Sequence, residues 1–366
     1  MGFSEFIGNQ RIVAALRAML AQGRVPHALL FTGPRGVGKY LLARMFAQAA
    51  NCERLQDDFC GACGPCRRIE QLADPQPFIE QGLAERGEAA DAATVERVPL
   101  ILQTHPDVWV LVPDPVRLSN PVARPVIRMG QLRAVQRAAY FRPQARRRVF
   151  ILDGAETMRW DYANIFLKIL EEPPETATLI LLAPSPDLLL PTIQSRCLKF
   201  HLAPLPAEQV EELLGRKSKR KAAERRLAAQ LSGGRPGVAL ALDLEESTRL
   251  RRELLGLIER GLADGPWEEI FAQTSQLARD ERESFENLLE LLYSLCTDLL
   301  ELSSGIRNQP LRNPDLQAEL EPLSQKVTVE WVCRAVGRLD ELHGRLRRNI
   351  HRQLGLEAVV ISLRGA

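Results

Sequence analysis

The sequence predicts a parallel α/β domain followed by domains built only from helices, and three observations support this prediction. Short apolar runs alternate with amphipathic segments up to about residue 203, as in sheets whose strands are joined by crossover helices. A glycine-rich turn follows the first apolar run, at residues 33–40. Beyond Pro204 the strand pattern stops, and apolar residues recur at helical spacing.

The predicted elements of the α/β part follow in chain order. An amphipathic helix occupies residues 9–22 and ends at Gly23. Strands are predicted at residues 28–31, 108–112, 149–153, 179–183 and 198–202, and helices between them at 41–50, 129–140 and 162–170. Residues 187–193 form at most a short turn. The stretches 73–104 and 113–125 lack clear periodicity, so we expect them to be insertions, the first of them partly mobile.

The helical part of the chain divides in two. Residues 206–243 fit three short helices, and longer helices with leucine-rich stripes follow from about residue 245. Such stripes are typical of a core, and they also suit packing between subunits. We therefore predict three domains: residues 1–203, which include a cysteine module at 52–66, then 204–244, then 245–366.

Residues 33–40 read Gly-Pro-Arg-Gly-Val-Gly-Lys-Tyr, which is a phosphate-binding loop with one substitution. In the pattern G-x-x-x-x-G-K-[ST], the glycines let backbone N–H groups turn toward a phosphate, the lysine reaches its oxygens, and the hydroxyl holds Mg²⁺. Gly33, Gly36, Gly38 and Lys39 fit this role, but Tyr40 replaces the hydroxyl residue. A chance glycine-rich turn is the alternative, and the flanking strand and helix argue against it.

A second motif of nucleotide sites is also incomplete. Residues 148–153 form a buried-strand pattern that ends in Asp153, which can help to position Mg²⁺. Gly154 follows where a water-orienting glutamate would stand, and the next acid, Glu156, is displaced by two residues. The sequence therefore predicts a degenerate ATP or ADP site, with Mg²⁺ held weakly or not at all, and little hydrolysis.

Four of the seven cysteines lie close together in the sequence, at Cys52, Cys60, Cys63 and Cys66. The C-x2-C spacings suit one tetrahedral Zn²⁺, and four thiolates leave no position for a reactive water, so the predicted site is structural. Unconnected reduced thiols or a redox pair are the alternatives. The other three cysteines, at positions 197, 296 and 333, have apolar neighbours, and we expect them in the core.

Composition excludes a strong global attraction to nucleic acid or membrane. The formal net charge is +2, from 48 basic and 46 acidic residues, and the basic clusters at 146–148, 216–221 and 345–352 are most simply solvated helix faces. The first ten residues lack an apolar signal core, and no stretch approaches transmembrane length. We expect a cytoplasmic protein that does not contact membranes.

Several further strings, together with the motifs above, resemble bacterial clamp-loader ATPase subunits over roughly residues 3–243. They are residues 6–10 (Phe-Ile-Gly-Asn-Gln), 25–31, 105–107 (His-Pro-Asp), 164–174, which end in Glu-Glu-Pro-Pro, and 190–197, which end in Ser-Arg-Cys; residues 348–357 resemble the C-terminal collar of the same family. The resemblance implies an AAA+ module with a zinc insert, a three-helix lid and a helical collar. It also implies a ring with gamma/tau and delta subunits that acts on the sliding clamp and primer-template DNA.

Within this family the departures fit a delta-prime-type stator better than a gamma/tau-type motor. Besides Tyr40 and Gly154, residues 183–185 lack the polar sensor, and Gly237 stands where the motor's lid carries a sensor arginine. The resemblance implies that Arg196, in the Ser-Arg-Cys motif, is an arginine finger for a neighbour's ATP; an ordinary surface salt bridge is the alternative.

Other readings of the sequence are weaker. The neighbouring pair Glu171-Glu172 is expected to be solvated and to end a helix before Pro173. A gamma/tau-type motor is the alternative within the family. A small-molecule P-loop kinase ranks last, because it explains neither the cysteine module nor the Ser-Arg-Cys motif.

Overall fold

The computed structural model describes residues 2–87, 91–115, 125–263, 266–279, 285–305, 311–345 and 351–364. They divide into two compact units: Met1–Leu213 with Gly234–Val238, and Leu214–Gly233 with Ala239–Ala366. The division into three domains stays a prediction.

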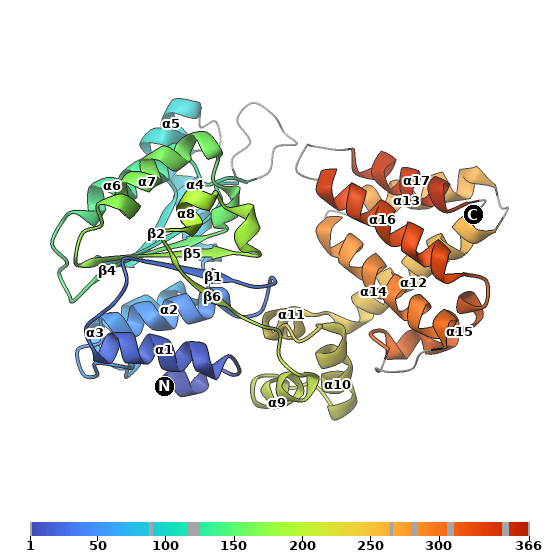
Figure 1. The fold of residues 1–366 in the computed structure, drawn as a ribbon, viewed down its shortest axis with the longest axis horizontal. Helices are drawn as coiled ribbons and strands as arrows, with labels where there is room; N and C mark the ends of the chain where they lie inside the picture. Colours follow the sequence, from blue (N-terminus) through green and yellow to red (C-terminus); the bar gives the residue numbers. More distant parts are fainter. Residues whose placement is uncertain are drawn as a thin grey trace. The chain divides into compact units, whose positions relative to one another are not determined.

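The first unit is built on a six-stranded sheet with the strand order β2-β3-β4-β5-β1-β6 (Figure 1). The strands are β1 (Ala28–Thr32), β2 (Ile101–His105), β3 (Val108–Leu111), β4 (Arg148–Asp153), β5 (Ala177–Ala183) and β6 (Leu198–His201). All neighbouring strands pair in parallel except β2 and β3, which are antiparallel. The five predicted strands are present.

The predicted parallel sheet has one antiparallel edge, where β2 pairs with β3. Residues 101–104 were assigned to an insertion, but together with His105 they form β2, which makes a hairpin with β3. The apolar run of this strand is interrupted by two polar residues, Gln103, which is exposed, and Thr104, which is half-buried. An edge strand with one solvent-exposed face has only a weak hydrophobic pattern, which explains why this strand was not predicted from the sequence.

Alternate residues of the central strands face two different helical layers. Leu29, Phe31 and Ile151 pack with helices α1 and α2, whereas Leu30 and Phe150 pack with α6 and α7. Figure 1 shows these two layers on opposite faces of the sheet. The helices that precede β6 in the chain are α1 (Gln10–Ala21), α2 (Lys39–Ala50), α3 (Gly64–Glu70), α4 (Gln76–Arg86), α5 (Ala92–Arg97), α6 (Met129–Ala139), α7 (Ala163–Glu171) and α8 (Pro191–Gln194). The 3₁₀ turns of the same segment are η1 (Phe3–Glu5), η2 (Gln71–Ala73), η3 (Ala155–Thr157), η4 (Trp160–Tyr162) and η5 (Pro186–Leu188).

The predicted insertion at 73–104 is largely regular where it is described. It contains α4, α5 and most of β2, and a buried ion pair ties it to the segment after β3: Arg86 Nη1 lies 2.7 Å from Asp114 Oδ2, with the two side chains 1% and 0% exposed. Arg86 Nε also donates to Val98 O at 2.7 Å. Of the second expected insertion, 113–125, residues 116–124 lie outside the described residues.

The helical segments after β6 agree with the predicted pattern. The three short helices are α9 (Ala207–Lys217), α10 (Ala222–Leu231) and α11 (Pro236–Ala241). The longer ones are α12 (Leu244–Leu262), α13 (Trp267–Arg279), α14 (Phe285–Ser304), α15 (Gln317–Ser324), preceded by the 3₁₀ turn η6 (Pro314–Leu316), α16 (Val329–Arg345) and α17 (Arg352–Leu363). Residues 346–350, in the expected collar motif and basic cluster, lie outside the described part.

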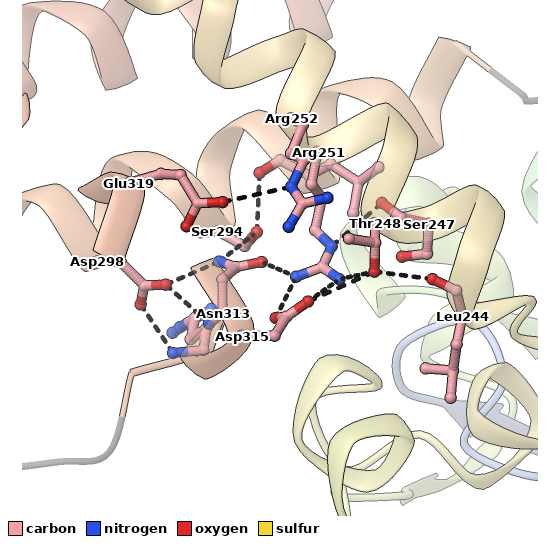
Figure 2. A network of polar contacts seen from close by, with 12 residues as sticks. Leu244, Ser247, Thr248, Arg251, Arg252, Ser294, Asp298, Asn313, Asp315 and Glu319 are labelled. Atoms are coloured by element: carbon pink, nitrogen blue, oxygen red, sulfur yellow. Dashed lines mark hydrogen bonds and ion pairs between the residues drawn. The ribbon is translucent and has the colours of Figure 1, made fainter. Parts of the chain in front are cut away.

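The leucine stripes of α14 and α16 are buried in the core of the helical unit, together with residues of α12 and α17. A polar network crosses this unit beside the core: Arg251 contacts Asp315 and Asn313, and Asn313 contacts Asp298 (Figure 2). Of the three cysteines expected in the core, the one at 296 is buried and the one at 197 is partly buried, but the one at 333 is exposed. That last expectation is wrong because this position lies on the solvent side of α16. None of the helices in the described segments is long and apolar enough to span a bilayer.

Candidate functional site

The phosphate-loop motif lies at the carboxyl edge of the sheet, between β1 and α2. Its three glycines all have left-handed backbone angles, with φ of 138° at Gly33, 82° at Gly36 and 104° at Gly38. Side chains disfavour these angles, and a Cβ added at Gly33 would lie 2.3 Å from Leu202 O. The glycines are therefore required by the turn itself.

Two other segments hold this loop in place. Gly33 N donates a hydrogen bond to Pro184 O, just beyond β5, at 3.1 Å. Gly237 N, at the start of α11, donates to Gly36 O at 2.8 Å. A Cβ on Gly237 would lie 3.0 Å from Gly36 O, so the residue expected to replace a sensor arginine packs directly against the loop backbone.

Lys39 and Asp153, which the sequence predicts for a nucleotide site, both lie at this edge, and their charges interact there. Lys39 Nζ donates to Gly33 O at 2.6 Å and to Pro34 O at 2.9 Å. Burial lowers the pKa of Lys39, while the charges of Asp153 and Glu156 act in the opposite direction. Burial raises the pKa of Asp153, and the charge of Lys39 opposes that shift. The two groups stabilise each other's charged forms.

Tyr40, at the position where the motif has a Mg²⁺-binding hydroxyl, makes a structural hydrogen bond. The phenol of Tyr40 donates a hydrogen bond to Leu72 O at 2.6 Å, behind the cysteine module, and burial raises its pKa. Gly154 has φ 76°, and a Cβ there would lie 2.9 Å from Pro113 Cγ. The described residues around the loop thus offer neither a serine or threonine hydroxyl at position 40 nor an acid at position 154.

The four cysteines predicted from their spacing do converge. Their sulfur atoms, on Cys52, Cys60, Cys63 and Cys66, all lie within 4.8 Å of one another. Zn–S bonds of about 2.3 Å place the sulfurs of a tetrahedral site about 3.8 Å apart, so the cluster fits Zn²⁺. The backbone N–H groups of Ala62 and Cys63 donate to Cys60 Sγ at 3.5 and 3.3 Å.

Electrostatics at this cluster differ from one sulfur to the next. Hydrogen bonds from the backbone lower the pKa of Cys60 to about 6, and the bond from Ala62 has the largest effect. Burial raises the pKa of Cys66. A thiolate at Cys60 is the form that binds a metal ion. Cys66 O accepts a hydrogen bond from Gln48 Nε2 at 3.0 Å, so α2 carries the phosphate loop at one end and supports the cysteine cluster at the other.

Arg196 lies near the surface, in the turn between α8 and β6. Its Nη2 is 2.8 Å from Glu171 Oε1, with side-chain exposures of 35% and 51%. The surface salt bridge considered from the sequence is therefore present. Such a pair does not exclude a role in recognising a phosphate, because an exposed ion pair exchanges partners at little cost.

Sequence reasoning missed two contacts of these residues. Glu171 does end α7, as expected, but it is paired with Arg196 and not merely solvated. The hydrogen bond from Tyr40 to Leu72 was also missed. Neither has a local sequence signal, because each joins segments that only the tertiary fold brings together.

Two family models match the chain. The one described as DNA polymerase III, delta subunit, matches residues 8–206, and the one described as DNA polymerase III, delta subunit, C terminal, matches residues 250–364. The first match alone covers more than half of the chain.

Curated relatives and solved structures were also found. The tau subunit of DNA polymerase III from Escherichia coli strain K12 is 32% identical over 215 residues, which are 58% of this chain and 27% of that protein. The gamma/tau subunit from Mycobacterium tuberculosis strain H37Rv is 33% identical over 214 residues, 58% of this chain and 31% of that one. The chain thus spans less than a third of the length of these relatives.

Among solved structures, a DNA polymerase III gamma subunit-related protein from Thermotoga maritima aligns with a TM-score of 0.42 and 18% identity, covering 96% of this chain and 98% of its own. The Thermotoga maritima RuvB Holliday junction branch migration motor aligns with a TM-score of 0.41 and 15% identity, covering 89% of this chain and 85% of that one. The family matches, which extend over the sheet, the phosphate loop and most of the helical unit, decide the assignment: the chain belongs to the DNA polymerase III delta-subunit family of clamp-loader proteins.

Proposed function

We propose that this chain is a non-hydrolysing stator, of the delta-prime type, in a DNA polymerase III clamp loader. In this role it joins gamma/tau and delta subunits in a ring in the cytoplasm, and the assembly loads a sliding clamp onto primer-template DNA. The chain contributes Arg196 to the ATP of a neighbouring subunit and hydrolyses little or no ATP itself. Its collar, residues 245–366, supplies the contacts that close the ring.

One observation carries this proposal: Arg196 lies at the edge of the sheet opposite to the chain's own phosphate loop. Strands β1 and β6 pair in parallel from Leu29 with Leu198 to Thr32 with His201. The loop follows the carboxyl end of β1, whereas Arg196 precedes the amino end of β6. Four paired residues span roughly 13 Å, which is more than an arginine side chain can bridge. Its guanidinium is therefore suited to a phosphate on another molecule.

The state of the loop supports the non-hydrolysing part of the proposal. The Tyr40 phenol donates a hydrogen bond to Leu72 O and is therefore not available as a Mg²⁺ ligand. Gly154 carries no carboxylate to orient water. Gly33, Gly36, Gly38, Lys39 and Asp153 still form a cradle that suits a di- or triphosphate. We propose that any ATP or ADP bound there is bound without efficient turnover.

The cysteine cluster is proposed to hold a structural Zn²⁺. Cys52, Cys60, Cys63 and Cys66 would fill all four positions of a tetrahedral ion, so no water could be activated on it. The ion would connect the end of α2 to α3. The site thereby stabilises the helix that presents Lys39.

An ATP-hydrolysing motor of the gamma/tau type is the second candidate. The identities of 32% and 33% to tau and gamma/tau subunits favour it. It requires a serine or threonine hydroxyl for Mg²⁺ and a carboxylate to orient water, and the described residues at positions 40 and 154 provide neither.

Turnover separates the two candidates. The isolated chain should hydrolyse ATP no faster than its Lys39→Ala variant, which lacks the loop lysine. Complexes reassembled with gamma/tau and delta subunits should lose DNA- and clamp-stimulated turnover when they carry Arg196→Ala. An arginine finger accounts for about 10³–10⁵ in rate at its own site, and the loss for the complex is smaller because other sites keep their fingers. Brisk turnover by the isolated chain that Lys39→Ala abolishes would identify a motor.

A further inference from the structure

The guanidinium of Arg196 is held by acceptors from two separate elements. Nη2 contacts Glu171 Oε1, at the end of α7, at 2.8 Å. Nη1 donates to Thr192 O on α8 at 3.0 Å, and a longer contact of 3.5 Å joins it to Ser195 Oγ. One end of the planar group is thus fixed by a carboxylate and a helix carbonyl.

The backbone places Glu171 where it meets this group. Helix α7 ends at Glu171, since the following Pro173 and Pro174 cannot continue it. The next residue is held on both sides: Glu172 N donates to Lys168 O at 3.0 Å, and Glu172 O accepts from the Tyr140 hydroxyl at 3.2 Å. The carboxylate of Glu172 makes no contact with Arg196 among the described residues.

The contacts leave one edge of the guanidinium available. An arginine has five N–H donors, and the contacts above use two on Nη1 and one on Nη2 of Arg196. Within the described part of the chain, Nε and the second Nη2 hydrogen have no acceptor. Arginine binds two phosphate oxygens through such an edge. Glu171 therefore takes only one of the two Nη2 hydrogens, and Nε has no acceptor among the described residues.

We propose that Glu171 is a positioning residue for Arg196, which it holds with its Nε/Nη2 edge turned toward a neighbouring subunit's nucleotide. This inference rests on the proposed function of Arg196 as a finger in trans. Without Glu171 the long side chain samples other rotamers, and fewer complexes present the guanidinium correctly. The rate at the neighbouring site should then fall by about two- to fivefold, the range expected for one exposed ion pair.

The test uses reassembled clamp-loader complexes in which the other subunits carry alanine at their own Ser-Arg-Cys arginines, so that turnover reports this finger alone. Clamp- and DNA-stimulated kcat and KM for ATP are compared for the wild-type chain, Glu171→Ala, Arg196→Ala and the double variant. Glu172→Ala is the matched control, because it removes the adjacent carboxylate without touching Arg196. Thermal melting and gel filtration check folding and assembly.

The expected result is a lower kcat with unchanged KM for Glu171→Ala, no change for Glu172→Ala, and no further effect of Glu171→Ala when Arg196 is already alanine. An equal loss in the Arg196→Ala background would overturn the positioning role, because the effect would then not act through Arg196. A wild-type or higher rate for Glu171→Ala, with Arg196→Ala inactive, would also overturn it and leave the finger intact. If Arg196→Ala itself turns over normally, the proposed function fails and the inference fails with it.

Discussion

Replacing Arg251 by methionine should destabilise the helical unit by about 3 kcal/mol. Arg251 is 0% exposed, and its Nη1 and Nη2 lie 2.7 and 2.8 Å from the two carboxylate oxygens of Asp315 (Figure 2). Nη1 also donates to Asn313 Oδ1 at 3.2 Å. Removing one member of a buried pair costs about 3–5 kcal/mol. Asp315 is 20% exposed and can regain water, which places the cost at the lower end.

The neighbouring arginine provides a control in the same helix. Arg252 is 60% exposed, and its Nε lies 3.3 Å from Glu319 Oε1, which belongs to a side chain that is 40% exposed. An exposed pair of this kind contributes at most about 1 kcal/mol. Arg252→Met removes the same charge and introduces the same side chain, so the difference between the two variants reports burial and hydrogen bonding.

Thermal unfolding followed by calorimetry measures this difference. For a unit of this size each kcal/mol shifts the melting temperature by about 2–4 °C, so Arg251→Met should lower it by about 6–12 °C and Arg252→Met by no more than about 4 °C. Equal melting temperatures for the two variants would refute the reasoning, since they would show that the buried network contributes no more than a surface pair.

Three further predictions concern the sites of the first unit. Purified protein should contain about one Zn²⁺ per chain; Cys63→Ser should remove it and lower the melting temperature, Cys333→Ser should not, and Zn²⁺ should be lost as pH falls because the thiolates become protonated. Tyr40→Ser combined with Gly154→Glu should strengthen Mg-nucleotide binding, measured by calorimetry, without restoring turnover. The double variant should also be less stable, because the hydrogen bond of the phenol is lost and a glutamate must adopt a φ of 76° at position 154. Gly237→Val should cost about 1–3 kcal/mol in chemical denaturation, because its Cβ would press on Gly36 O; an unchanged midpoint would mean that α11 moves away freely.

Local patterns made much of this fold predictable from the sequence. The strands β1, β4 and β5 are buried on both faces and therefore read as continuous apolar runs, and each was predicted within two residues of its bounds. The glycines of the phosphate loop and the paired C-x2-C spacings are also local signals, because their geometry is set by residues only a few positions apart. The sulfur cluster was predictable for that reason.

Contacts between distant segments explain what was missed. Strand β2 has exposed and half-buried residues among its apolar ones, and only its pairing with β3 makes it a strand. Arg196 meets Glu171 because α7 and β6 both reach the amino edge of the sheet, and no sequence spacing encodes that meeting. The contact of Arg251 with Asp315 similarly depends on the packing of α12 beside the segment that precedes α15.

The parallel sheet explains how a chain can lose ATP hydrolysis at its own site and still supply an arginine to a neighbouring subunit, as we propose. Because β1 and β6 run in the same direction, a loop after β1 and an arginine before β6 must lie at opposite edges of the sheet. In the proposed ring each subunit therefore presents a phosphate-binding edge to one neighbour and an arginine edge to the other, which is a head-to-tail arrangement. Tyr40 and Gly154 alter only the first edge, whereas Arg196 and Glu171 belong to the second. Loss of hydrolysis at one edge consequently places no constraint on the guanidinium at the other.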